Sequence, residues 1–177
     1  RVIGGVEHRK IVETTIGRVI FNDAIPQDLG TKPRKTVDDI LSLLMDAGGN
    51  YIDLFMGSPD IRDHVGAALR GRRERMMVQG HIGAVWQDDQ YLRTRDPDLC
   101  RTFVDDLLRR LQTDYVDVLM IHFVDEADEW DRLLEPGGIL DIARSYRDAG
   151  HARAIGLSSH VPSVAQRAVD LGYDGIE

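Results

Sequence analysis

Short apolar runs alternate with segments of helical periodicity along the chain from about residue 30 onward. The apolar runs predict strands at residues 50–55, 76–79, 116–123 and 152–158. Apolar residues at helical spacing predict helices at 37–44, 61–69, 97–111, 139–146 and 162–169, and a polar loop is expected over 83–95. A series of strand-then-helix units predicts an α/β fold with a parallel sheet.

Two architectures fit that series, a doubly wound sheet and a (β/α)8 barrel. No Gly-x-Gly-x-x-Gly sequence follows the early strands, so the dinucleotide fingerprint of the doubly wound fold is missing. Polar residues close the successive strands instead, at Asp53, His81, His122 and Ser158-Ser159-His160, and barrel enzymes carry their chemistry at this end. We predict a (β/α)8 TIM barrel over residues 31–177. A complete barrel takes about 250 residues, so the chain is expected to be a fragment with about five or six of the eight units.

Composition limits the classes of function. Acidic residues outnumber basic residues by 30 to 22, for a net charge of −8. Nucleic acids and anionic membranes need a basic face, so neither is an expected partner. The single cysteine, Cys100, leaves no intrachain disulfide, CxxC zinc site or cysteine-ligated iron–sulfur cluster. No apolar run approaches the roughly 20 residues of a membrane span, and no signal-peptide pattern begins the chain. We therefore expect a cytoplasmic protein with a small-molecule partner.

Asp53 and His122 are candidate site residues because each breaks an apolar strand. A buried carboxylate must be paired or hydrogen-bonded, so Asp53 is either a structural aspartate or a carboxylate that orients a base. His122 is either a core histidine with satisfied nitrogens, or a donor to a substrate oxygen or general acid–base.

His81 and the segment Ser158-Ser159-His160 are the other candidates. Gly80 precedes His81, and a strand glycine allows a ligand or a backbone to approach closely. His81 is then either an ordinary loop histidine or a site residue. The hydroxyls and amides of the serine segment either bind an amide or phosphate group, or cap the next helix.

Several motifs, from about residue 33 to the end of the chain, resemble the aldo-keto reductase superfamily. They are Gly49-Asn50-Tyr51-Ile52-Asp53, Gly71-Arg72-Arg73, the segment from Leu111 to His122, and the segment from Ala152 to His160. Gln79-Gly80-His81 and the segment from Gln90 to Asp96 resemble the branch whose full-length members often carry a C-terminal ferredoxin-like iron–sulfur segment. No such cluster segment stands in these 177 residues.

This resemblance implies an enzyme that reduces a small-molecule carbonyl substrate with NADPH or NADH. The family's catalytic tetrad is Asp, Tyr, Lys and His, and Asp53 and His122 match its first and last members. Ser58 stands at the tyrosine position and His81 at the lysine position. Hydride delivery leaves an alkoxide that needs a proton or a positive dipole. We hypothesise that a charged His81 supplies the proton while His122 polarises the same oxygen.

The resemblance also implies cofactor contacts. Ser158 matches the family serine that hydrogen-bonds the nicotinamide amide, and Ser159 stands where asparagine is commoner. Contacts to the adenosine phosphate come mostly from later strands of the family's barrel. We therefore expect this chain alone to bind the cofactor weakly.

Residues 1–30 form an N-terminal segment of undefined origin, and about residues 10–30 resemble part of the β′ subunit of bacterial RNA polymerase. Either a foreign segment has been joined to the reductase, or residues 18–21 are a diverged first strand. Two other functions stay open for the barrel. One is a catalytically degraded relative with a binding or structural role. The other is a metal-dependent hydrolase that uses Asp53, His81, His122 and His160.

Overall fold

The computed structural model describes residues 19–20, 36–55, 58–88, 90–171 and 175–176. The strands in these ranges are β1 (Val19–Ile20), β2 (Tyr51–Asp53), β3 (Met77–Ile82), β4 (Ala84–Gln87), β5 (Gln90–Arg93), β6 (Val116–Ile121), β7 (Ala152–Leu157) and β8 (Gly175–Ile176). The helices are α2 (Val37–Asp46), α3 (Pro59–Leu69), the 3-10 helix η1 (Arg73–Arg75), α4 (Pro97–Leu111), α5 (Ala127–Leu133), α6 (Ile139–Asp148) and α7 (Pro162–Asp170). The predicted alternation of strands and helices is confirmed, and α5 is a helix that the sequence patterns did not indicate.

One parallel sheet organises the molecule, with the strand order β1-β2-β3-β6-β7-β8. All five neighbouring pairs are parallel. The order along the sheet therefore follows the order along the chain and never reverses. A doubly wound sheet reverses at a switch point, whereas a barrel sets successive strands side by side. The predicted barrel architecture is confirmed, and the described residues supply six parallel strands of it.

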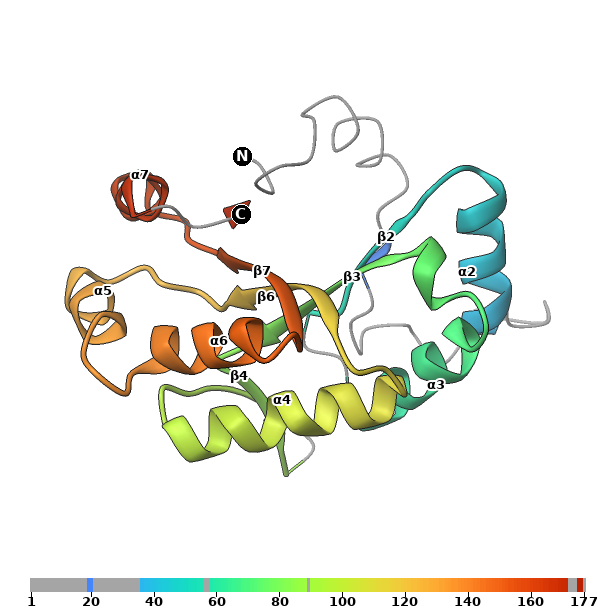
Figure 1. Cartoon of the computed structure of the whole chain (residues 1–177), viewed down its shortest axis with the longest axis horizontal. Helices are drawn as coiled ribbons and strands as arrows, with labels where there is room; N and C mark the ends of the chain where they lie inside the picture. Colours follow the sequence, from blue (N-terminus) through green and yellow to red (C-terminus); the bar gives the residue numbers. More distant parts are fainter. Residues whose placement is uncertain (1–18, 21–35, 56–57, 89, 172–174, 177) are drawn as a thin grey trace.

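Helices α2, α3, α4 and α6 lie on one side of the sheet (Figure 1). The main core fills the space between these helices and the sheet, and Leu119 and Ile121 of β6 belong to it. Val118 and Met120, which alternate with them along β6, form a separate small cluster with Ala154 of β7. Because successive side chains of a strand point to opposite faces, β6 is apolar on both faces, as its continuous apolar run predicts.

Helix α4 begins as the sequence predicts. The side chain of Asp96 accepts a hydrogen bond from the Leu99 amide at 2.8 Å, and Pro97 is the first helical residue. The buried stripe of the helix consists of Cys100, Val104, Leu107, Leu108 and Leu111. Leu99, which shares the helical spacing of Leu107 and Leu111, is 38% exposed.

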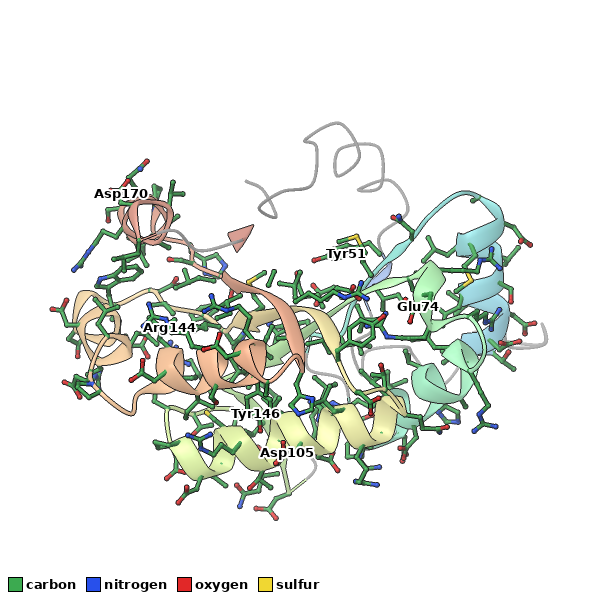
Figure 2. The ribbon with its side chains drawn as sticks, in the orientation of Figure 1. Tyr51, Glu74, Asp105, Arg144, Tyr146 and Asp170 are labelled. Carbon is green, nitrogen blue, oxygen red and sulfur yellow. The ribbon has the colours of Figure 1, made fainter. Side chains whose placement is uncertain are left out.

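Polar contacts also join neighbouring helices. Figure 2 shows Tyr146 of α6 next to Asp105 of α4, and the tyrosine hydroxyl donates to the carboxylate at 2.6 Å. Burial and this carboxylate raise the pKa of Tyr146, so the hydroxyl keeps its proton. The contact fixes the relative position of two helices that cover the strands of the candidate site.

The expectation of a polar loop over residues 83–95 is wrong. Strands β4 and β5 form an antiparallel hairpin, with Trp86 paired opposite Tyr91. Asp88 lies in the turn and has a φ of 51°. The sequence signal was weak because an Asp-Asp pair is a poorer hairpin turn than Asn-Gly or Asp-Gly. The hairpin follows β3 directly, so it lies at the carboxyl end of the parallel sheet.

Strand β1 pairs in parallel with β2, and Val19 lies opposite Ile52. This strand falls inside the range 18–21 that one interpretation gave as a diverged first strand. The rest of residues 1–30 lies outside the described residues. The proposed domain boundary at residue 30 stays a prediction.

Candidate active site

The predicted site residues gather at the carboxyl edge of the sheet. Asp53 is the last residue of β2, and His81 is the next to last residue of β3. His122 directly follows β6, and its amide donates to the Ile82 carbonyl at 2.9 Å. Asp53, His81 and His122 are at most 6% exposed. The fold therefore brings together three side chains from three different strands.

Asp53 and His81 are in direct contact. Oδ1 of Asp53 lies 2.9 Å from Nε2 of His81. The side-chain nitrogen Nε2 of Gln79 lies 3.1 Å from the same ring atom. An ionised carboxylate only accepts, so the hydrogen on Nε2 is directed at Asp53. The carboxylate thereby fixes the ring orientation of His81. Nδ1 of His81 has no hydrogen-bond partner among the described residues.

An aromatic cluster surrounds the two imidazoles. The ring centroids of His81 and His122 are 5.4 Å apart. Phe55 lies beside both, with its ring centroid 5.4 Å from that of His81 and 4.9 Å from that of His122. Tyr91 of the hairpin completes the cluster, because its hydroxyl lies 2.5 Å from Nε2 of His122.

Sequence analysis did not identify Tyr91 as a site residue. Its contact with His122 joins residues 31 positions apart, and it exists only because β4 and β5 fold back over the end of β6. The available signal was the pattern itself. Two short runs rich in aliphatic and aromatic residues, 84–87 and 90–93, flank two aspartates.

The environment of His122 keeps its ring neutral. Burial is the largest cause, and the neighbouring His81, Arg95 and Arg93 act in the same direction. Together they lower the pKa of His122 from 6.5 to about 3, although Asp53 acts in the opposite direction. Nδ1 of His122 has no partner among the described residues. At neutral pH this ring can donate or accept a hydrogen bond but carries no charge.

Two arginines attach the hairpin side of the site to the end of β6. Arg95 donates to the carbonyl oxygens of His122 and Phe123, at 2.8 and 2.9 Å. It also lies 3.6 Å from Glu129 of α5. Arg93 contacts the same glutamate at 3.5 Å, and its guanidinium lies 5.5 Å from the ring centroid of Phe123. The backbone beside His122 is therefore held by side chains from the hairpin and the segment after it.

Ser158 and Ser159 follow β7 and have different surroundings. The oxygen of the Ser158 hydroxyl accepts a bond from the Phe123 amide at 2.8 Å. The Ser159 hydroxyl donates to Asp125 at 3.2 Å and accepts from the Val161 amide at 3.0 Å. The interpretation of Ser159 as a turn residue is thus supported by its contacts, and its assignment to cofactor binding stays a prediction.

Three other residues, Gly80, Ser58 and Cys100, have a role in packing or in helix geometry. A Cβ on Gly80 would lie 2.5 Å from Cδ2 of Leu107, so this glycine makes room for helix α4 rather than for a ligand. Ser58 precedes helix α3 at its N-cap position. Cys100 is buried, and burial raises the pKa of its thiol to about 11. These three residues are better explained by packing and helix geometry than by chemistry at the site.

His160 lies outside the cluster of imidazoles. Its Nδ1 lies 2.9 Å from Asp125, and its side chain is 74% exposed. No group of three or more His, Cys, Asp or Glu side chains in the described part of the chain has an arrangement suited to a metal ion. Among the residues that the structure describes, no helix has the length and hydropathy of a membrane span.

The sheet order is that of a (β/α)8 barrel, and the contact between Asp53 and His81 lies at the carboxyl ends of its strands. The family model described as "Aldo/keto reductase family" matches residues 22–176. The chain belongs to the aldo/keto reductase family.

Individual relatives agree with this assignment. The aldo-keto reductase YhdN of Bacillus subtilis is 28% identical over 134 residues, which are 73% of this chain and 38% of that protein. An aldo-keto reductase of Bacillus halodurans in its holo form matches with a TM-score of 0.64 at 24% identity, over 75% of this chain and 44% of that chain. An aldo-keto reductase of Klebsiella pneumoniae in complex with NADPH matches with a TM-score of 0.53 at 21% identity, over 71% of this chain and 40% of that chain. This chain spans less than half the length of each of these relatives.

The predicted resemblance of the N-terminal segment is confirmed as well. The β′ subunit of the DNA-directed RNA polymerase of Acetivibrio thermocellus is 59% identical over 46 residues. These are 26% of this chain and only 4% of that subunit. The match therefore concerns a segment, and the family assignment of the barrel is independent of it.

Proposed function

We propose that this chain carries part of the active site of an NAD(P)H-dependent carbonyl reductase. The observation that carries the proposal is the contact of Asp53 with His81 beside His122, at the edge of the sheet where barrel enzymes hold their reacting groups. We assign a catalytic role to Asp53, His81 and His122. The cytoplasmic location and the link to the iron–sulfur branch stay predictions.

The residues present fit a nicotinamide group. The Ser158 hydroxyl accepts a bond from the Phe123 amide, and its own hydrogen has no acceptor among the described residues. It is available to donate to the carboxamide of a nicotinamide. Nδ1 of His81 and Nδ1 of His122, which have no hydrogen-bond partner among the described residues, are further polar atoms of the same cluster. When bound, NAD(P)H supplies the hydride.

The side chains act on the oxygen of the carbonyl group. Reduction places negative charge on this oxygen, and prepositioned N–H groups stabilise that charge at little reorganisation cost. Asp53 fixes His81 in one orientation, so that Nδ1 faces away from the carboxylate. His122 contributes a neutral ring, because its pKa of about 3 keeps it uncharged at neutral pH.

The proposal is tested with a purified full-length protein that contains this segment, with NADPH, NADH and a panel of aldehydes and quinones. Nicotinamide fluorescence reports binding, and its loss reports turnover. We expect binding of at least one cofactor and turnover of at least one carbonyl compound. His81→Gln and Asp53→Asn should each lower kcat by about 100-fold or more if their groups act on the reacting oxygen.

Two results would contradict the proposal. No nicotinamide binding and no reduction of any panel member would favour a degraded relative with a binding role. Stoichiometric zinc or iron in the purified protein, together with hydrolytic activity, would favour the metal-dependent hydrolase.

A further inference from the structure

Among the described residues, neither Ser58 nor His122 is suited to supply the proton that a reduced carbonyl oxygen takes up. Ser58 stands at the position where the family carries its tyrosine, and an aliphatic hydroxyl is a much weaker acid than a phenol. His122 is neutral because burial and nearby positive groups lower its pKa to about 3. A phenol that reaches the same cluster from another element would supply what is missing.

Tyr91 is such a phenol. It belongs to hairpin strand β5, its hydroxyl lies 2.5 Å from Nε2 of His122, and its ring is perpendicular to the imidazole at a centroid distance of 5.6 Å. Phe55 contacts the rings of Tyr91 and His122 and closes the cluster on one side. The tyrosine is half-buried, so its hydroxyl lies between the protein interior and the outside of the site.

A second phenol near the site has a different partner. The Tyr51 hydroxyl donates to the side-chain oxygen of Gln79. Tyr51 opens β2, two residues before Asp53, and therefore lies farther from the carboxyl edge of the sheet. Tyr91 contacts an imidazole of the site through its hydroxyl.

We propose that Tyr91 is the proton donor of this reductase, and that His122 is a positioning residue that acts through the Tyr91 hydroxyl. This inference rests on the proposed carbonyl reduction and sharpens it. It replaces a direct contact of His122 with the substrate oxygen by a contact through Tyr91. It also makes His81 a neighbour that Asp53 holds in place beside His122, rather than the proton source.

The charges around Tyr91 suit this role. Burial raises the pKa of Tyr91 above 10.0, while Arg93 and Arg95 oppose that rise. The hydroxyl is therefore protonated at neutral pH and ready to donate. After it has donated, the same two arginines and an N–H of His122 stabilise the phenolate.

The step balances in atoms and electrons. NAD(P)H supplies one hydride, which is a hydrogen with two electrons, to the carbonyl carbon. The π electrons of the C=O bond move onto the oxygen, and this oxygen takes the hydroxyl proton of Tyr91 as the O–H bond breaks. The tyrosine is left as a phenolate and recovers its proton from water, and the product is an alcohol.

The test compares Tyr91→Phe with Tyr115→Phe in the same full-length protein. Tyr115 precedes β6 at the opposite end of the sheet, where its hydroxyl contacts Glu74, so the control removes the same atom away from the site. We expect Tyr91→Phe to lower kcat by about 100-fold or more with little change in KM, and Tyr115→Phe to leave kcat unchanged. The wild-type rate of reduction should fall at alkaline pH as Tyr91 loses its proton, and Tyr91→Phe should lose that fall.

A binding measurement supplies a readout without turnover. Benzaldehyde is titrated by calorimetry into wild type and Tyr91→Phe, each saturated with NADP⁺. Loss of one hydrogen bond to the carbonyl oxygen should weaken binding about fivefold. An unchanged affinity for benzaldehyde in Tyr91→Phe would contradict the inference. This comparison also holds if the wild type binds the cofactor but shows no turnover.

The outcomes separate the two proposals. If the wild type reduces carbonyl compounds and Tyr91→Phe keeps the full rate, Tyr91 is not the donor, although the reductase proposal stands. If His81→Gln loses the rate of reduction while Tyr91→Phe keeps both the rate and its fall at alkaline pH, His81 is the donor. If the wild type neither binds a nicotinamide cofactor nor reduces any carbonyl compound, the reductase proposal fails and the inference about Tyr91 fails with it.

Discussion

His122 shows at the scale of one residue how burial decides chemistry. Its position after four apolar residues was sufficient to mark it as a site candidate. Its charge state was not predictable, because that depends first on its burial and then on His81, Arg95 and Arg93, which other segments bring close. A sequence shows which side chains break an apolar pattern, but not which groups from distant segments surround them.

The low pKa of His122 predicts a loss of stability in acid. The unfolded ring takes up a proton below pH 6.5, whereas the folded ring does so only near pH 3. Between these values the unfolded state binds more protons, so the free energy of unfolding falls as the pH falls. The contribution of this residue should approach ~1.4 kcal/mol per pH unit. Urea unfolding from pH 4 to 8 measures it.

The variant His122→Asn is the control for this prediction. It lacks the titrating ring, so its stability should depend less on pH than that of the wild type over the same window. An NMR titration of the ring provides the direct check. A midpoint for His122 near 6.5 would show that burial does not hold the ring neutral.

At the scale of elements, the regular βα units were predictable and the inserted hairpin was not. The helix starting at Pro97 was predictable because Asp96 and Pro97 are strong local start signals. Strand β6 was predictable from its apolar run. The hairpin depends on a weak turn sequence. Because residues 83–95 were interpreted as a loop, the contact of Tyr91 with His122 was not predicted. Local signals of helices are thus easier to read than a long-range contact.

The chain requires a glycine between β3 and the first strand of the hairpin, β4. Gly83 has a φ of 90°, and an added Cβ would lie 2.6 Å from Nη1 of Arg95 and 3.0 Å from Cδ1 of Ile139. Gly83→Ala should cost about 1–2 kcal/mol for the left-handed backbone. It should also displace the hairpin and lower the rate of carbonyl reduction.

Gly48→Ala is the matched control for Gly83→Ala. Gly48 has a φ of 84°, but an added Cβ there meets no atom within 4 Å. Both variants should lose stability in urea unfolding through the backbone strain, Gly83→Ala somewhat more because of its contacts, and only Gly83→Ala should lose activity. Equal activity in the two variants would show that the position of the hairpin does not matter for the reaction.

At the scale of the whole molecule, the two ends of the parallel sheet have different roles. The carboxyl end carries the candidate site. The other end carries Asp117, which is 6% exposed and accepts bonds from Arg73, Arg153 and the Val78 amide, each at 2.8 Å. This carboxylate joins β3, β6 and β7, and barrel enzymes use this end for stability.

Asp117→Ala should therefore lower stability without changing the chemistry. Removal of one partner from a buried ion pair costs about 3 kcal/mol. Asp128→Ala removes only the exposed pair between Asp128 and Arg132 and should cost less than about 1 kcal/mol. Urea unfolding measures both losses. The kcat of folded Asp117→Ala should match the wild type, and a large fall in kcat would contradict the division of roles.

The hydrogen bonds from Arg95 to the carbonyl oxygens of His122 and Phe123 have an evolutionary consequence for the segment from β4 to Arg95. The segment that anchors this peptide also presents Tyr91, so an insertion or deletion within it would disturb an anchor and a reacting group at once. Lineages that acquire new substrates through this segment are expected to conserve its length. Their variation should concentrate at Gln87, Asp88 and Gln90, which do not make the contacts of Arg95 or of Tyr91 with the end of β6.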